Sequence, residues 1–159
     1  AGMLLQAFRQ KKLPVVHMQH VSARPGAAFF LPNTRGMEIH ESVAPQPGEA
    51  VFQKNFPNSF RGTPLLEHLR KLGTEQLVIA GMMTQMCVDS TTRAAADLGF
   101  KCVLAHDACA TRALSFGGAN VTAQNVQTAF LAALNGLFAG LAALFDVSLN
   151  KGLVVAADA

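Results

Sequence analysis

The chain has 159 residues, of which 50% are hydrophobic and 14% are charged, a composition typical of one compact globular domain rather than a disordered chain. The net charge of +3 comes from scattered basic residues, with Arg9, Lys11 and Lys12 as the main cluster, so nucleic acid is not an expected partner. Three cysteines lie far apart without a CxxC or Cys/His cluster, which argues against a disulfide framework or a structural zinc site. The chain opens without a signal-peptide pattern, so we expect a cytoplasmic protein.

Hydrophobic periodicity and the positions of glycine and proline predict alternating strands and helices. In chain order we expect a helix over 1–12, a strand over 13–21, a long loop over 22–50, a strand over 50–53 ending at Lys54, a helix over 63–71, a strand over 77–80, a helix over 85–98, a strand over 101–105, a loop around Asp107 and a long helix from about Val121. This alternation predicts an α/β fold, a three-layer sandwich with a doubly wound, Rossmann-like parallel sheet, in one domain over residues 1–159.

Polar residues follow several of these predicted strands. His17 and His20, Lys54, the Gly81–Cys87 turn and Asp107 all come at or after a strand end. Because ligands of open parallel sheets bind beyond the carboxyl ends of the strands, we expect these residues to meet at one edge.

The segment from Ala129 to Phe145 is almost wholly apolar. It falls short of the roughly 20 residues that span a bilayer and lacks flanking basic anchors, so we expect no membrane insertion. A helix that is apolar on all sides is usually buried, which predicts packing against another subunit and hence a homo-oligomer.

Cys87 follows the strand 77–80 and a glycine, at the expected start of a helix. The unpaired N–H groups and the positive dipole end of a helix favour a thiolate there, and the same N–H groups suit an oxyanion. The alternative is a small apolar cysteine packed between helix and sheet.

Three stretches together resemble one known family: Lys54-Asn55-Phe56-Pro57-Asn58-Ser59-Phe60-Arg61-Gly62-Thr63-Pro64-Leu65, the turn from Gly81 to Arg93, and Gly99 to Leu104 leading to Asp107-Ala108. Their order and spacing are similar to those of the isochorismatase-like cysteine hydrolases, which include nicotinamidases and N-carbamoylsarcosine amidohydrolases. The resemblance covers roughly residues 3–140.

The resemblance implies a catalytic Lys and Cys acting with an Asp, with Lys54 and Cys87 in the first two places. It also implies a non-proline cis peptide at Met82–Met83 and an oxyanion hole formed by the backbone N–H groups of Met83 and Cys87. An ammonium group near the thiol favours thiolate.

Two further residues are expected to contact the substrate, which we take to be a small molecule. His20 is interpreted as a loop or substrate-facing histidine, and Phe60 follows Lys54 closely in the sequence. His17 is interpreted as a core histidine, and Cys102 and Cys109 as structural. Nicotinamidases bind a metal through Asp-x-His and a further His, but no aspartate lies near His20, so we expect neither a metal nor another cofactor.

The chain departs from the family pattern because the catalytic Asp normally ends a first, central strand, whereas this sequence starts in the helix that follows it. Two occupants are open for the central position. Either residues preceding the given sequence supply it, or Leu153 to Ala157, a strand-like run followed by Asp158, replaces it as in a circular permutant.

These observations predict a hydrolase that cleaves the C–N bond of a small amide or carbamoyl compound through a Cys87 acyl intermediate. The alternative is a catalytically silent binding or assembly protein of the same fold that lacks the Asp base. The loop over 22–50 carries no readable code for the substrate.

Overall fold

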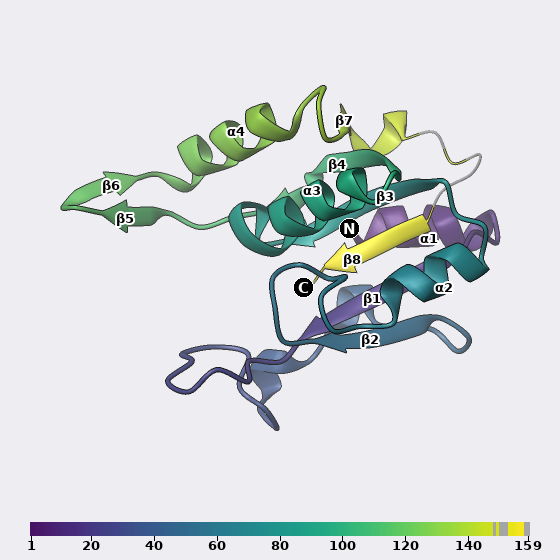
Figure 1. Ribbon diagram of the computed structural model, residues 1–159, viewed down its shortest axis with the longest axis horizontal. Helices are drawn as coiled ribbons and strands as arrows, with labels where there is room; N and C mark the ends of the chain where they lie inside the picture. Colours follow the sequence, from purple (N-terminus) through teal and green to yellow (C-terminus); the bar gives the residue numbers. More distant parts are fainter. Residues whose placement is uncertain (148, 150–152, 158–159) are drawn as a thin grey trace.

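A six-stranded parallel sheet forms the centre of the computed structural model, which describes residues 1–147, 149 and 153–157 (Figure 1). The strand order is β2-β1-β8-β3-β4-β7. Its strands are β1 (Val15–His20), β2 (Ala50–Lys54), β3 (Gln76–Met82), β4 (Lys101–Ala110), β7 (Gly140–Ala142) and β8 (Leu153–Ala157). The main helices are α1 (Gly2–Gln10), α2 (Leu65–Lys71), α3 (Asp89–Asp97) and α4 (Ala123–Leu134).

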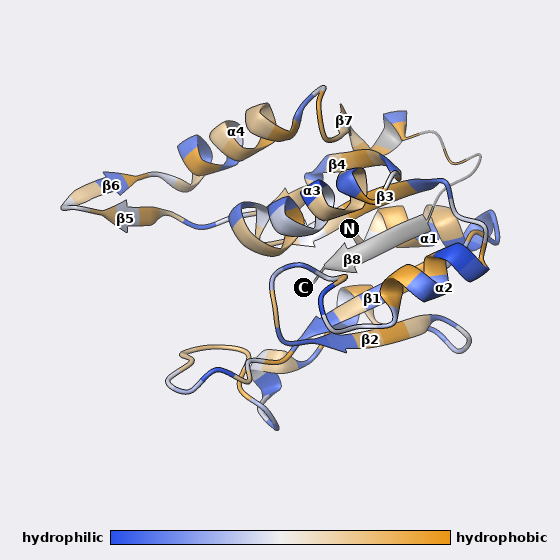
Figure 2. Ribbon diagram, viewed as in Figure 1, coloured by the Kyte–Doolittle hydropathy of each residue, from blue (hydrophilic) through white to orange (hydrophobic). Residues whose placement is uncertain are grey.

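Hydrophobic side chains on both faces of the sheet make this a three-layer sandwich, as predicted. Leu77 and Ile79 point into the core under α2, α3 and α4, while Val78 and Ala80 point into the core under α1. The alternation follows from the two-residue period of a strand, and burial on both faces explains why β3 reads as a continuous apolar run. Figure 2 shows hydrophobic residues along α4 and polar residues at the C-terminal end of α2.

The central position of the sheet is filled by β8, from the C-terminal part of the chain. Its backbone pairs in parallel with β1, where Val16 is level with Val155, and with β3, where Ile79 is level with the same residue. Of the two occupants left open by the sequence, the structure shows Leu153–Ala157. Asp158, the residue that follows, lies outside the described residues.

The expected helix over Ala129–Phe145 was wrong. The helix α4 ends at Leu134, Gly136 adopts a φ of 85°, and the chain then forms β7 and a 3-10 turn over Leu144–Asp146. Periodicity cannot distinguish a buried strand from a buried helix in a short apolar run, and β7 is held by pairing with β4, which local sequence does not encode. Among the described residues, the structure contains no helix long and apolar enough to cross a membrane.

The expected loop around Asp107 was also wrong, because β4 continues to Ala110. Its pairing with β3 shifts register between Ile79 and Gly81, so extra residues of β4 bulge past the partner strand. The carboxylate of Asp107 accepts the backbone N–H of Leu144 at 2.9 and 3.0 Å, which ties β4 to the turn after β7.

A projecting hairpin follows β4 and was not anticipated (Figure 1). Its strands β5 (Leu114–Phe116) and β6 (Ala119–Val121) pair in antiparallel fashion. Gly117 and Gly118 join them, both with positive φ, as a two-residue hairpin turn requires. Phe116 is 92% exposed at its end.

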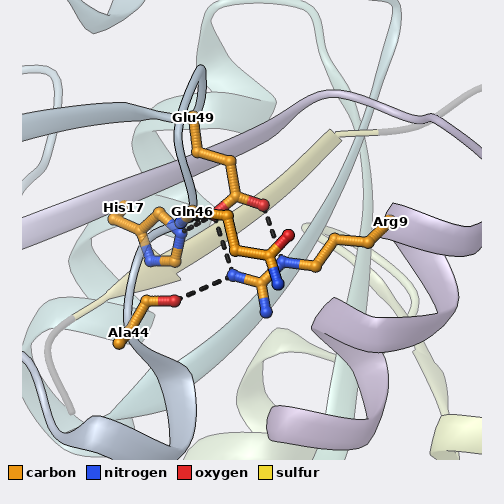
Figure 3. Close-up of polar contacts among 5 residues, drawn as sticks. All are labelled: Arg9, His17, Ala44, Gln46 and Glu49. Carbon is orange, nitrogen blue, oxygen red and sulfur yellow. Dashed lines mark hydrogen bonds and ion pairs between the residues drawn. The ribbon is translucent and has the colours of Figure 1, made fainter.

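An ion-pair cluster closes the long loop between β1 and β2 (Figure 3). Arg9, at the end of α1, donates to both carboxylate oxygens of Glu49 at 2.7 and 2.8 Å, and to the carbonyl of Ala44. The backbone N–H of Gln46 donates to the same carboxylate, and His17 Nε2 lies 2.9 Å from it. Arg9 thereby joins α1 to the end of the loop. The pKa of Glu49 is lowered to about 2, and the hydrogen bonds from Arg9 are the largest cause.

We expect Glu49→Gln to lower the free energy of unfolding at pH 7 by about 2–3 kcal/mol, since the folded pKa lies well below the ordinary value of 4.5. The ionised carboxylate stabilises the fold above about pH 4.5, and this contribution is lost as the pH falls toward 2. Urea unfolding of both proteins between pH 7 and pH 3.5 should therefore show a difference that narrows in acid. The exposed Glu38 gives the matched control, and an equal effect of Glu38→Gln would contradict the prediction.

Candidate active site

The carboxyl ends of four parallel strands meet at one edge of the sheet. His20, the last residue of β1, is level with Lys54, the last residue of β2. Ala157, at the end of β8, is level with Met18 and with Gly81. The pairing thus sets the ends of β1, β2, β3 and β8 side by side, as predicted for this edge.

A tight turn joins β3 to α3 and carries Cys87. The peptide between Met82 and Met83 is cis, as the family resemblance implied. A π-helical turn over Thr84–Val88 comes next, in which the carbonyl of Met83 accepts from Met86 and Val88, and α3 begins at Asp89. Cys87 therefore lies in the π-helical turn that leads directly into α3, and it is 5% exposed.

The Gln85 side chain anchors this turn to the end of β4. Its carbonyl oxygen accepts a short hydrogen bond from the hydroxyl of Thr111, which follows β4. Gln127 of α4 donates to the carbonyls of His106 and Cys109, so α4 also fixes the end of β4. The cysteine turn is therefore held from outside its own helix.

A cavity of about 470 Å³ opens at this edge. It is bounded by the start of the long loop, by the segment after β2 and by the cysteine turn. The lining residues are His20, Ser22, Ala23, Arg24, Ala27, Ala28, Phe29, Phe30, Asn55, Phe56, Pro57, Met83, Met86 and Cys87. Its size is within the range of small-molecule sites.

Lys54 ends β2 at this edge of the sheet and is buried, with 1% of its surface exposed, although it does not line the cavity. Its Nζ donates to the carbonyl of Pro57 at 3.0 Å, and the hydroxyl of Thr91 lies 3.3 Å from the same oxygen. The Thr91 hydroxyl also lies 2.9 Å from Ser59 Oγ and accepts from the Ser59 N–H. Since Thr91 is on α3, one helical turn after Cys87, this buried network ties the segment of Lys54 to the helix of the cysteine.

The structure brings together most of the residues proposed from the sequence. Cys87, Met83 and His20 line the cavity. Phe60 does not: its ring is stacked on Phe100 at 6.1 Å between centroids, and it packs against the core. Phe56 lines the cavity in its place, because the segment after β2 directs the earlier phenylalanine to the cavity and the later one toward the core.

Other residues behave as structural parts. His17 is buried, on the α1 side of the sheet, in the Glu49 cluster. Asp89 and Arg93 form an i,i+4 ion pair at 3.0 Å on α3. Burial raises the pKa of the Cys102 thiol to about 11, and burial likewise raises the pKa of Cys109 to about 12. Cys109 lies in β4 rather than in a loop.

Sequence reasoning missed the aromatic part of the lining. Phe29 and Phe30 come from the long loop, and their rings contact edge to face at 5.3 Å, while Phe30 also lies 5.4 Å from the His20 ring. An adjacent aromatic pair inside a Gly/Pro-rich segment was the available signal. In the part of the chain that the structure describes, no group of three His, Cys, Asp or Glu side chains is placed to hold a metal ion.

The fold and this edge define an α/β protein with a cysteine and a buried lysine beside a small-molecule cavity. The isochorismatase domain model matches residues 1–139. An uncharacterised isochorismatase family protein, YddQ of Bacillus subtilis, is 47% identical over 139 residues, which are 87% of this chain and 77% of that protein. A crystal structure described as an isochorismatase hydrolase, from Oleispira antarctica, superposes with a TM-score of 0.86 at 49% identity, covering 91% of this chain and 76% of that one.

The chain therefore belongs to the isochorismatase family, whose members are hydrolases. A streptothricin hydrolase of Streptomyces noursei is 40% identical over 68% of this chain and 42% of its own. Nicotinamidase 3 of Arabidopsis thaliana is 36% identical over 65% of this chain and 58% of its own. Maleamate amidohydrolase of Pseudomonas putida is 30% identical over 64% of this chain and 43% of its own. YddQ apart, this chain spans about half the length of these curated relatives.

Proposed function

We propose that this protein is a cysteine hydrolase that cleaves the C–N bond of a small amide or carbamoyl compound through an acyl intermediate on Cys87. The observation that carries the proposal is that Cys87, in the turn between β3 and α3, lines a cavity of small-molecule size. Relatives named for the hydrolysis of amides, among them maleamate amidohydrolase, support the same reaction class.

In the proposed reaction the thiolate of Cys87 attacks the amide carbonyl, and a tetrahedral oxyanion forms. Backbone N–H groups of Met83 and Cys87 stabilise this oxyanion. The C–N bond then breaks, the amine leaves with the proton taken from the thiol, and a thioester remains. Water attacks the thioester, releasing the acid and restoring the thiol.

Lys54 has an electrostatic part in this scheme. A buried ammonium group near the cysteine helix favours the thiolate over the thiol and then stabilises negative charge on the substrate. Its hydrogen bond to the carbonyl of Pro57 fixes the position of the ammonium group. The Thr91–Ser59 contact in turn fixes the segment of Pro57 against α3. Lys54→Met, which keeps the length of the chain, is the variant that removes the charge.

The base of the scheme is proposed to be Asp158. It lies outside the described residues, and the support comes from its neighbour in the sequence. Ala157 ends β8, level with Gly81 at the start of the cysteine turn and with Met18, two residues before His20. The strand β8 therefore ends at the same edge of the sheet as β1, β2 and β3, where Lys54 and the cysteine turn lie. In the alternative, a catalytically silent binding or assembly protein of the same fold, no base acts beside the cysteine.

Cys87 should be the reactive thiol. With iodoacetamide at neutral pH, we expect Cys87, which lines the cavity, to be alkylated at least tenfold faster than Cys102 and Cys109, whose thiol pKa values are raised and which do not line it. Mass spectrometry of the digested protein measures the three rates. Cys87→Ala should abolish amide hydrolysis, with Cys102→Ala as the control. Equal rates at all three cysteines would contradict the nucleophile.

Asp158→Asn should lower kcat for amide hydrolysis by at least 100-fold, because an amide side chain cannot accept the thiol proton. The control is Asp146→Asn, in the exposed 3-10 turn after β7. Full activity of Asp158→Asn would show that another group is the base. No hydrolysis of any amide by the unaltered protein, with Cys87 unreactive, would instead favour the silent-protein alternative.

We also propose that the protein is a homo-oligomer. The expectation first rested on an apolar helix that proved shorter, and the structure offers a different reason. Phe116 of the projecting hairpin is 92% exposed and Leu137, after α4, is 80% exposed, both large apolar side chains. Light scattering at micromolar concentration should give a multiple of the 16.8 kDa chain mass, and Phe116→Ser should reduce it. A monomer mass for the unaltered protein would refute the proposal.

A further inference from the structure

The cavity beside Cys87 has a mostly apolar wall. Three phenylalanines, at 29, 30 and 56, and two methionines, at 83 and 86, are its large apolar lining side chains, and three alanines and a proline add smaller apolar ones. The edge-to-face contact of Phe29 with Phe30 fixes the orientation of both rings. Such a wall favours a substrate whose main group is flat and apolar.

Among the described residues, the charge on the cavity lining is positive. Arg24 is the charged side chain of the lining, and none of the described lining residues is a carboxylate. The guanidinium of Arg61, which does not line the cavity, lies 3.7 Å from the centre of the Phe56 ring and adds a second positive charge nearby. An ammonium group brought into this part of the cavity loses water and gains repulsion.

Arg24 differs from the arginines that build the fold. Arg9 is engaged by Glu49 and Arg93 by Asp89. Arg24 is exposed, and its guanidinium makes no hydrogen bond or ion pair with the residues that the structure describes. An unengaged guanidinium at the mouth of an apolar cavity matches a carboxylate, which it can hold by two parallel hydrogen bonds.

We propose that the preferred substrate is an amide with a flat apolar or aromatic body and a carboxylate remote from the scissile bond, and that Arg24 binds this carboxylate. The proposal rests on the proposed function and names its substrate class. The apolar body lies between the phenylalanines and Met86, the amide carbonyl faces Cys87, and the carboxylate reaches the rim.

Three compounds of similar size test the charge preference: 4-carbamoylbenzoate, 4-methylbenzamide and 4-(aminomethyl)benzamide. With ammonia release as the assay, we expect kcat/KM to fall in that order, at least tenfold from the anion to the cation, and the ratio to shrink in high salt. Adding 3-carbamoylbenzoate measures how far Arg24 lies from the amide. Equal or better hydrolysis of the cationic amide would overturn the proposal.

Arg24→Gln tests the residue itself. We expect it to reduce the ratio of kcat/KM between 4-carbamoylbenzoate and 4-methylbenzamide about tenfold, through KM, and Arg24→Lys to restore part of the ratio. Arg35→Gln is the matched control, since Arg35 is exposed in the same loop and does not line the cavity. An unchanged ratio in Arg24→Gln would overturn the role of Arg24.

Binding to Cys87→Ala, followed by calorimetry, separates this proposal from the proposed function, because binding needs no thiol. We expect 4-carbamoylbenzoate to bind at least tenfold more tightly than the cationic amide. If 4-carbamoylbenzoate binds more tightly but the unaltered protein hydrolyses none of the amides, the proposed binding site is supported and the proposed amidase activity is refuted. Hydrolysis without charge preference would keep the amidase and refute the binding site. Failure of all three compounds to bind would overturn the proposal.

Discussion

The parallel pairing of β8 with both β1 and β3 is the interaction on which the rest of this structure depends. A central strand satisfies backbone donors and acceptors on two neighbours at once, and each neighbour carries a different half of the candidate site. On one side β1 leads to His20 and, through β2, to Lys54. On the other, β3 leads to the cis peptide and Cys87. Without a strand between them, these halves have no fixed register, and two sheet edges would be open to other chains.

Register then converts this pairing into a site. Parallel strands keep their carboxyl ends at the same edge of the sheet. Strand pairing alone therefore brings residues that are far apart in the sequence to this edge, even where their side chains make no contact. Finer placement comes from short side-chain bridges. The Thr91–Ser59 pair links α3 to the segment that holds Lys54, and the Thr111–Gln85 bond links the cysteine turn to β4. Both use hydroxyl groups, which fit in buried or partly buried positions at little cost once they are hydrogen-bonded.

Much of this arrangement could be predicted from the sequence, because it is encoded locally. The run before Gly81 is apolar on both faces and therefore predicts a buried strand, and Gly73 marks the end of α2 with a positive φ. The position of β8 could be named as one of two alternatives but not selected, because strand pairing joins residues more than 70 positions apart. The same reason explains β7 and the full length of β4. The cavity lining was the least accessible, since the loop around Phe29 and Phe30 has no period, and the difference between Phe56 and Phe60 depends on how one turn is folded.

The site therefore has two parts with different physical origins. The reacting groups proposed here are on strand ends and a helical turn, whose positions are set by the backbone of the sheet. The side chains proposed for recognition, Arg24 and Phe30 among them, are on a loop whose far end is held by the Arg9–Glu49 ion pair. Changes in that loop can alter what enters the cavity while the register of β1, β8 and β3 stays the same. Relatives named for substrates as different as streptothricin and maleamate are consistent with this division. Substrate preference in this protein should accordingly follow the loop and its anchoring charge pair, whereas the reaction type follows the sheet.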